Sequence, residues 1–229
     1  MPRRYPAPRS RTDHQLYDPI SDCTYCPMVN FCSGPVPPVG PVPAHVMLIG
    51  EAPASSEEEA DPRAPIVGAT WLELEPLLEL AGLNRDVVWI SNSVFCRPPN
   101  DPTYDDAREC WEAWKPIEIA CVQPRIVVLM GQIAIASLFE DAGVVVSEVR
   151  GFPVWWEPWS CWVLPTYHPA AVLHNDRYRA ALNEDFRYLA ALKIEALKGR
   201  AARVRERPVD AYTGKAQYRW GLPVVGGSR

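Results

Sequence analysis

The chain has 229 residues, of which 48% are hydrophobic and 22% are charged, which is enough apolar material for one ordinary domain with a core. Its formal net charge of −5 excludes a uniformly basic nucleic-acid binder, and no run of apolar residues is long enough for a membrane span. The first residues, MPRRYPAPRSRTDHQ, have no apolar segment of the kind found in secretory signals, so we predict a cytoplasmic protein.

The two ends of the chain differ in composition from the middle. Residues 1–22 contain four prolines and are predicted to be irregular. Residues 193–229 carry nine lysines and arginines against three acidic residues. We therefore expect an irregular segment over 1–22, a folded domain over 23–198 and a basic, flexible tail over 199–229. Such a tail either contacts phosphates or is simply solvated, and the second interpretation is favoured.

Between these ends, apolar runs alternate with helical patterns. Strands are predicted over residues 45–50, 87–92, 125–131 and 161–166. Helices are predicted over residues 70–82, 103–122, 132–140 and 176–198. The strands are almost wholly apolar, which is typical of a parallel sheet covered on both faces. We therefore predict an α/β fold, a three-layer α/β/α domain around a central, mostly parallel four-stranded sheet. In such sheets the site lies beyond the carboxyl ends of the strands.

Polar residues follow three of the predicted strands. Gly50 and Glu51 follow the first strand, Asn92 ends the second, and His168 comes just after the fourth. An asparagine amide offers a donor and an acceptor on one flat group, which suits the edge of a nucleobase. A histidine held by the proline that follows it can donate to a developing oxyanion. Each of these residue types also occurs in ordinary turns. What favours a functional site is that all of them follow the carboxyl ends of predicted strands.

Seven cysteines are present, more than a chain in a reducing compartment needs for packing. Cys23 and Cys26 form C-x2-C, whereas Cys96 and Cys110 are 14 residues apart. Four thiolates bind Zn²⁺ or a 4Fe–4S cluster, and spacing does not choose between these metals. Cys32 is an alternative ligand to one of these four cysteines. The remaining two, Cys121 and Cys161, lie in apolar patterns and are interpreted as small buried side chains.

In this order the motifs resemble the family 4 uracil-DNA glycosylases, the iron–sulfur branch of the uracil-DNA glycosylase superfamily. The resemblance runs from about Cys23 to Lys198. The matching positions are Cys23 and Cys26, Gly50-Glu51-Ala52-Pro53, Pro65-Ile66-Val67-Gly68, Asn92 with Cys96-Arg97-Pro98-Pro99, Cys110, and His168-Pro169-Ala170.

The resemblance implies an enzyme that hydrolyses the N-glycosidic bond of uracil in DNA and leaves an abasic site, as in base excision repair. It implies a 4Fe–4S cluster on Cys23, Cys26, Cys96 and Cys110. Because a base inside a duplex is out of reach, the target base must be flipped out of the stack. We also expect a monomer whose partner is DNA containing uracil or a modified base, with no membrane.

The resemblance also assigns roles to individual residues. Asn92 would read the flipped base, His168 would stabilise negative charge on its O2 atom, and Glu51 would help to place the water or the base. Arg97 would meet phosphates. Val172 and Leu173 would wedge into the vacated stack. The base-binding set is then Gly50, Glu51, Ala52, Ile66, Asn92 and His168.

One departure from the family pattern concerns the pocket. Ile66 stands where the family has the phenylalanine that stacks on the base, and aromatic stacking contributes about 1–3 kcal/mol per base. Two alternatives follow: a glycosylase-fold enzyme for a modified DNA base, or a catalytically weak DNA-binding homologue. A redox or zinc module is less favoured, because such a module does not need Glu51, Asn92 and His168.

Overall fold

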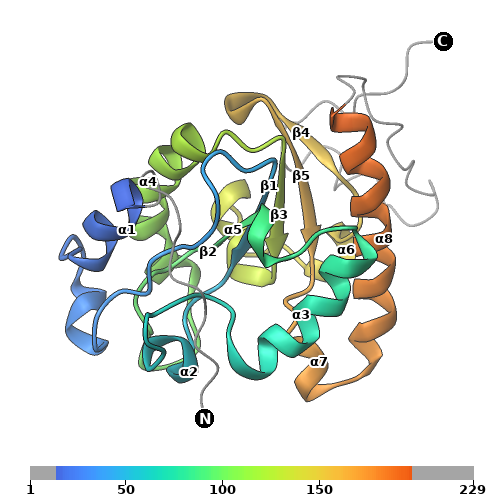
Figure 1. Ribbon diagram of the computed structural model, residues 1–229. Helices are drawn as coiled ribbons and strands as arrows, with labels where there is room; N and C mark the ends of the chain where they lie inside the picture. Colours follow the sequence, from blue (N-terminus) through green and yellow to red (C-terminus); the bar gives the residue numbers. More distant parts are fainter. Residues whose placement is uncertain (1–13, 198–229) are drawn as a thin grey trace.

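Four apolar segments form parallel strands of one sheet in the computed structural model, which describes residues 14–197 (Figure 1). They are β1 (Val46–Gly50), β2 (Val88–Asn92), β3 (Ile126–Met130) and β5 (Cys161–Thr166). Every residue of these strands is buried, because helices cover both faces of the sheet. The predicted strands are confirmed to within one residue at either end, and so is the α/β fold class.

A fifth strand corrects the predicted strand count of four. Strand β4 (Val154–Trp156) pairs antiparallel with β5, and the full order is β2-β1-β3-β5-β4. Within this hairpin Trp155 lies opposite Trp162, with ring centroids 5.5 Å apart. The strand has only three residues and lies between prolines, so it has no apolar periodicity by which the sequence could reveal it.

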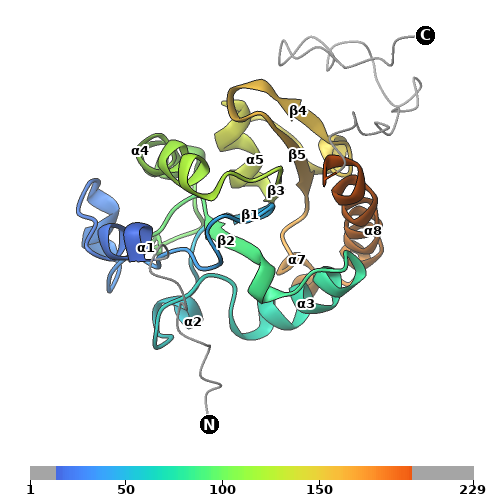
Figure 2. The ribbon, with the colours of Figure 1, turned by 45° about the horizontal axis from the view of Figure 1, so that its top comes forward.

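Helices on opposite faces of the sheet build two separate cores (Figure 2). One core takes residues from α4 (Tyr104–Val122), α5 (Gln132–Phe139) and α6 (Val146–Val149). The other takes residues from α3 (Gly68–Leu80), α7 (Ala171–His174) and α8 (Arg177–Leu197). Alternate strand residues serve the two cores: Met47 and Ile49 enter the first, whereas Val46 and Leu48 enter the second.

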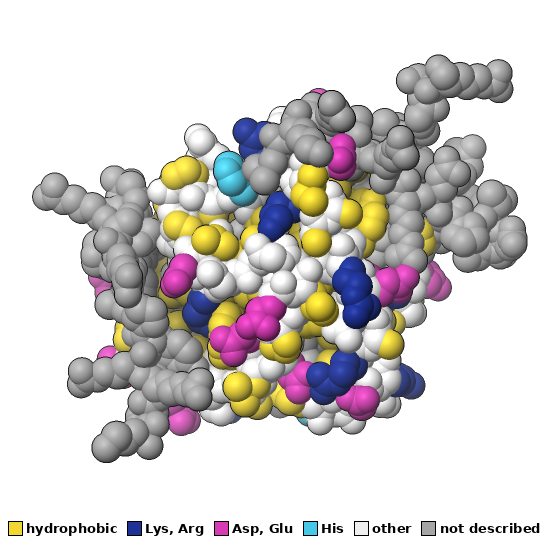
Figure 3. Space-filling view, turned by 45° about the vertical axis from the view of Figure 1, so that its right-hand side comes forward, with side chains coloured by type: hydrophobic (Ala, Val, Ile, Leu, Met, Phe, Trp, Pro, Cys, Tyr) yellow, Lys and Arg dark blue, Asp and Glu magenta, His cyan; other side chains and the backbone are white. Residues whose placement is uncertain are grey.

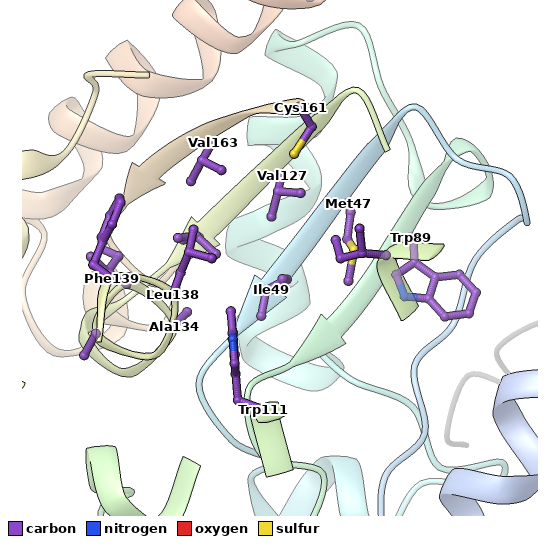
Figure 4. Packing of buried hydrophobic residues seen from close by; sticks show 14 of the residues in the cluster. Met47, Ile49, Trp89, Trp111, Val127, Ala134, Leu138, Phe139, Cys161 and Val163 are labelled. Carbon is purple, nitrogen blue, oxygen red and sulfur yellow. The ribbon is translucent and has the colours of Figure 1, made fainter. Parts of the chain in front are cut away.

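Figure 4 shows the first core at close range. Met47, Ile49, Val127 and Val163 project from neighbouring strands, and Cys161 extends this row. Cys161 is fully buried there, which agrees with its interpretation as a small apolar side chain. Cys121 also packs against this core, although it is only partly buried.

A capping box sets the start of α4. The Thr103 side chain accepts the N–H of Asp106 at 3.2 Å, and the Asp106 carboxylate accepts the N–H of Thr103 at 2.9 Å. This reciprocal arrangement satisfies two donors that a helix leaves free at its first turn. The helix register that follows places Cys110 among the buried residues of α4.

The region before β1 is partly ordered by the core. Helix α1 (His14–Ser21) forms where we predicted an irregular segment, because Leu16 and Ile20 pack in the first core. Residues 33–43 form no helix, because proline lacks the backbone N–H that a helix needs. They run beside β2, where Val39 and Ile90 exchange both backbone hydrogen bonds, and so cover the edge of the sheet.

Short helices complete the described elements. They are η1 (Pro27–Phe31), α2 (Ser55–Glu58), η2 (Arg85–Val87) and η3 (Glu157–Trp159). Across residues 14–197, no helix combines the length and apolar character that a membrane crossing requires. The predicted basic tail lies outside the described residues.

Candidate active site

The carboxyl edge of the sheet brings three of the predicted residues together. Gly50 and Asn92 are directly paired at the ends of β1 and β2. A Cβ atom added to Gly50 would lie 3.2 Å from Nε2 of His168 and would collide with Oδ1 of Asn92. Glycine at position 50 therefore keeps open a space that the asparagine and the histidine both face.

The Asn92 amide in this space is unusual. The side chain is only 1% exposed, and neither Oδ1 nor Nδ2 has a hydrogen-bond partner among the described residues. Leaving a buried polar group unpaired costs about 1–3 kcal/mol, so folded proteins rarely tolerate it without a reason. A planar ligand with an acceptor beside a donor would satisfy both atoms.

His168 presents its other nitrogen to the backbone. Its Nδ1 atom accepts the N–H of Ala170 at 3.3 Å, so the neutral ring carries its proton on Nε2, on the side of Gly50. Burial lowers the pKa of His168 below its ordinary value, although the nearby Glu51 carboxylate acts in the opposite direction. The side chain is thus a neutral N–H donor at neutral pH.

Glu51 is fixed at the beginning of α5. Its Oε1 atom accepts the N–H of Ile133 at 3.0 Å, which places the carboxylate at the positive end of that helix. Gly131 has φ +95, and a Cβ atom there would lie 2.6 Å from the Glu51 carboxyl carbon. Glycine before α5 is therefore needed for the carboxylate to reach the helix.

Ile66 is held in a strained conformation away from solvent. Its φ of +50 is rare for a β-branched residue, and its side chain packs in the second core at 1% exposure. The Glu57 carboxylate accepts the N–H of Ile66, and Arg85 donates to the carbonyls of Ile66 and Pro65 at 2.9 Å each. The backbone at this position is thus clamped from both sides.

Sequence reasoning missed this clamp. The loop over residues 55–63 looks acidic and solvent-facing, yet Glu57 and Glu58 are both buried. Burial raises the pKa of Glu57 to about 6, although Arg85 lowers it in part. Arg85 also lies 4.6 Å from the centroid of the Trp71 ring. The three consecutive glutamates are the only signal in the sequence of this loop, and the sequence does not indicate that Arg85 lies next to them.

The predicted DNA-binding residues are placed differently from one another. Leu173 is exposed on α7, whereas Val172 packs in the second core at 8% exposure, so the prediction that the two wedge into DNA stays a prediction and Leu173 is the more accessible of the pair. Arg97 is exposed and pairs with the buried Glu58 at 3.5 Å. Ala52, predicted at the base, packs instead against a third apolar cluster that contains Cys96.

The four predicted ligand cysteines gather near this third cluster. Cys110 interacts electrostatically with Cys23 and Cys26, and Cys96 with Cys26 and Cys110. Cys32 lies beside Cys96, and its thiol donates to the carbonyl of Val29 at 3.7 Å. Burial raises the pKa of Cys110 to about 12, and all five are free thiols.

Thiolates in an apolar setting are the donor set of iron–sulfur and zinc sites, so these residues fit such a group chemically. Within residues 14–197, however, no three or more His, Cys, Asp or Glu side chains form a ready-made metal site.

Comparison with known proteins identifies the family. Residues 37–189 match the model of the uracil DNA glycosylase superfamily. The type-4 uracil-DNA glycosylase of Sulfurisphaera tokodaii is 34% identical, over 79% of this chain and 84% of the relative. The type-4 uracil-DNA glycosylase of Saccharolobus solfataricus is 35% identical, over 75% of this chain and 82% of the relative. The type-4 uracil-DNA glycosylase of Archaeoglobus fulgidus is 32% identical, over 76% of this chain and 89% of the relative. The chain therefore belongs to the uracil DNA glycosylase superfamily and, within it, to the type-4 uracil-DNA glycosylases.

Proposed function

We propose that this protein hydrolyses the N-glycosidic bond of uracil in DNA and leaves an abasic site for base excision repair. The observation that carries the proposal is the partnerless, buried amide of Asn92 beside Nε2 of His168. The names of the relatives point to the same substrate. A duplex target must first be flipped out, because the bond is out of reach inside the stack.

Asn92 suits the Watson–Crick edge of uracil. Its Oδ1 atom would accept the N3–H of the base, and its Nδ2 atom would donate to O4. Both atoms lack partners among the described residues, so binding the base would supply the hydrogen bonds that folding leaves unmade. The missing side chain of Gly50 provides the room.

His168 would act as the base departs. When the bond between N1 of uracil and C1′ of deoxyribose breaks, the electron pair moves onto the base, and negative charge spreads to O2. A neutral imidazole with its proton on Nε2 stabilises this charge through a hydrogen bond, without first transferring the proton. Water then adds to C1′ and loses a proton, and N1 of uracil gains one. The Glu51 carboxylate would orient this water and offset the positive charge on the sugar.

We further propose that Cys23, Cys26, Cys96 and Cys110 hold a 4Fe–4S cluster. When bound, the cluster would tie the segment around η1 to the loop after β2 and to α4, which is a structural role. The proposal is supported by the closeness of these cysteines to one another and by the apolar residues around them. The monomeric state and the cytoplasmic location stay predictions from the sequence.

The cluster is tested by iron content and the visible spectrum of the purified protein. Cys23→Ala should lower both the iron content and the melting temperature, whereas Cys121→Ala should lower neither. Cys32→Ala decides whether Cys32 is a ligand, because Cys32 lies beside Cys96. A colourless protein that contains zinc would overturn the iron–sulfur proposal.

The activity is tested with a labelled oligonucleotide and alkali treatment, which breaks the strand at abasic sites. Uracil is presented in single strands and opposite guanine or adenine. His168→Ala should reduce cleavage by about 100–1,000-fold. His174→Ala is the matched control, because His174 is exposed on α7 only six residues away. No release of uracil by the wild type, with release of a modified base, would favour the alternative substrate suggested by Ile66.

A further inference from the structure

A cavity of about 510 Å³ lies near the carboxyl ends of β3 and β5. It is lined by residues of α5, α6, α8 and the turn after β5, among them Gln132, Val146, Ser147, Tyr167, Arg177 and Tyr178. Its volume falls in the range of sites that bind small molecules or single groups of a larger ligand. The predicted roles of Glu51, Asn92 and His168 do not use it.

Two residues that line this cavity, Tyr167 and Gln132, are chain neighbours of residues at the candidate active site. Tyr167 directly precedes His168 in the chain. Gln132 stands between Gly131, which packs against the Glu51 carboxylate, and Ile133, whose N–H binds that carboxylate. A DNA strand that delivers its base to His168 and Asn92 would therefore bring an adjoining nucleotide near this cavity.

The lining has the chemistry of a nucleotide site. The rings of Tyr167 and Tyr178 have centroids 4.7 Å apart. The guanidinium of Arg177 lies 4.7 Å from the Tyr178 ring centroid, and it donates to the Tyr178 hydroxyl at 2.6 Å. Aromatic faces beside a cation are the usual means of binding single-stranded nucleic acid, because every base has a π-face and every nucleotide has a phosphate.

Arg177 differs from its neighbour Arg179 in its ion pairs. Arg179 pairs with Asp176 and Glu73, each at 2.7 Å. Among the described residues, by contrast, no carboxylate pairs with Arg177. Figure 3 shows basic and acidic side chains interleaved on the face that it displays, rather than a continuous basic patch. The guanidinium of Arg177 at the cavity can therefore pair with a phosphate without first leaving a carboxylate.

We propose that this cavity binds the nucleotide next to the target base on the same strand, with its base against Tyr167 and Tyr178 and its phosphate at Arg177. The proposal rests on the proposed function, because that function brings the strand to His168. It predicts that the enzyme requires a nucleotide on one side of the target more than on the other.

The test combines substrate truncation with substitution. Wild type, Arg177→Ala and the matched control Arg179→Ala are compared on single-stranded oligonucleotides in which uracil is flanked on both sides, only on the 5′ side or only on the 3′ side. We expect removal of one flank to reduce wild-type kcat/KM about tenfold. Arg177→Ala should show that loss already on the full oligonucleotide and lose less than twofold more on truncation. Arg179→Ala should behave as wild type.

Two further measurements separate this proposal from the proposed function. Fluorescence anisotropy with uracil-free single strands reports binding without turnover, and Arg177→Ala should weaken it about tenfold while Arg179→Ala does not. Tyr178→Leu should weaken it also, whereas Tyr178→Phe should retain most of it, because the ring remains. If these binding effects are found but the wild type releases no uracil, the proposed glycosylase activity is overturned and the nucleotide site is not. Equal binding by Arg177→Ala and Arg179→Ala, or independent effects of truncation and substitution, would overturn the nucleotide site.

Discussion

Ser91 and Asn92 are neighbours on β2, yet their side chains face opposite surroundings. Ser91 accepts a hydrogen bond at 2.9 Å from Lys115, which also pairs with Glu118. Glu118 in turn accepts the indole N–H of Trp89 at 2.9 Å. The side-chain amide of Asn92, by contrast, has no hydrogen-bond partner among the described residues. Both regions bury polar atoms completely, but only one of them completes its hydrogen bonds.

The difference indicates what each region is for. The Lys115–Glu118 pair joins α4 to β2, and Lys115 also lies 4.4 Å from the centroid of the Phe95 ring. A closed network of this kind holds one arrangement of the elements. The open amide of Asn92 makes no such contribution, and the proposed recognition of a base would account for its burial. One strand thus carries structural support on one face and the candidate recognition group on the other.

The largest effect should come from opening the closed network. Lys115→Met leaves the Glu118 carboxylate buried without its cation and should lower the free energy of unfolding by about 3–5 kcal/mol. The double variant Lys115→Met/Glu118→Leu should recover most of this loss, because neither charge is then buried. Urea unfolding measures both. Equal losses in the single and double variants would mean that the pair does not act as a unit.

The reverse experiment removes the open amide. Asn92→Ala should reduce kcat/KM for uracil release by about 100-fold or more, because the base loses both of its hydrogen bonds. The free energy of unfolding should fall by less than about 1 kcal/mol, since an unsatisfied buried group disappears with the side chain. Ser91→Ala is the matched neighbour, and it should lower stability more than it lowers activity. The opposite ranking would contradict the division of roles on β2.

A second closed network lies at the carboxyl end of β5, two residues before His168. Asp185 on α8 is fully buried and accepts hydrogen bonds from Arg150 at 2.9 Å and from Thr166 at 2.7 Å. Asp185→Asn should lower the free energy of unfolding by about 2 kcal/mol, because charged hydrogen bonds become neutral.

Asp185→Asn should also reduce kcat, since Thr166 lies two residues before His168. Glu184→Gln is the control: it binds the same Arg150 from an exposed position and should change stability by less than about 1 kcal/mol. Comparable losses in both variants would refute a special role for Asp185.

The last prediction concerns how the stability of the protein depends on pH through Glu57. Because its pKa is about 6 in the folded protein against 4.5 in the unfolded chain, the folded state binds more protons between these values. Its contribution to stability is therefore complete below pH 4.5 and declines by up to about 2 kcal/mol as pH rises through 6. Relative to wild type, Glu57→Gln should gain stability between pH 4 and pH 7 in urea unfolding. A constant difference would show that Glu57 is not buried as described.

Much of the site was predictable because parallel strands end at one edge. Gly50, Asn92 and His168 follow separate apolar runs, and the topology alone brings such positions together. The roles assigned to them stay predictions. The clamp on Ile66 was not predictable, because Arg85 reaches it from 19 residues away and no local pattern records such a contact.

By itself the sequence determined the strands, the main helices and the polar residues at the strand ends, since these depend on periodicity and on neighbours in the chain. Only the tertiary structure decided which charged residues are buried and with whom they pair. Lys115 and Glu118 look like surface residues of a helix, and Arg177 and Arg179 look alike. Their difference arises from partners on other elements, because the energy of a charge depends on the groups and the solvent that the fold places around it.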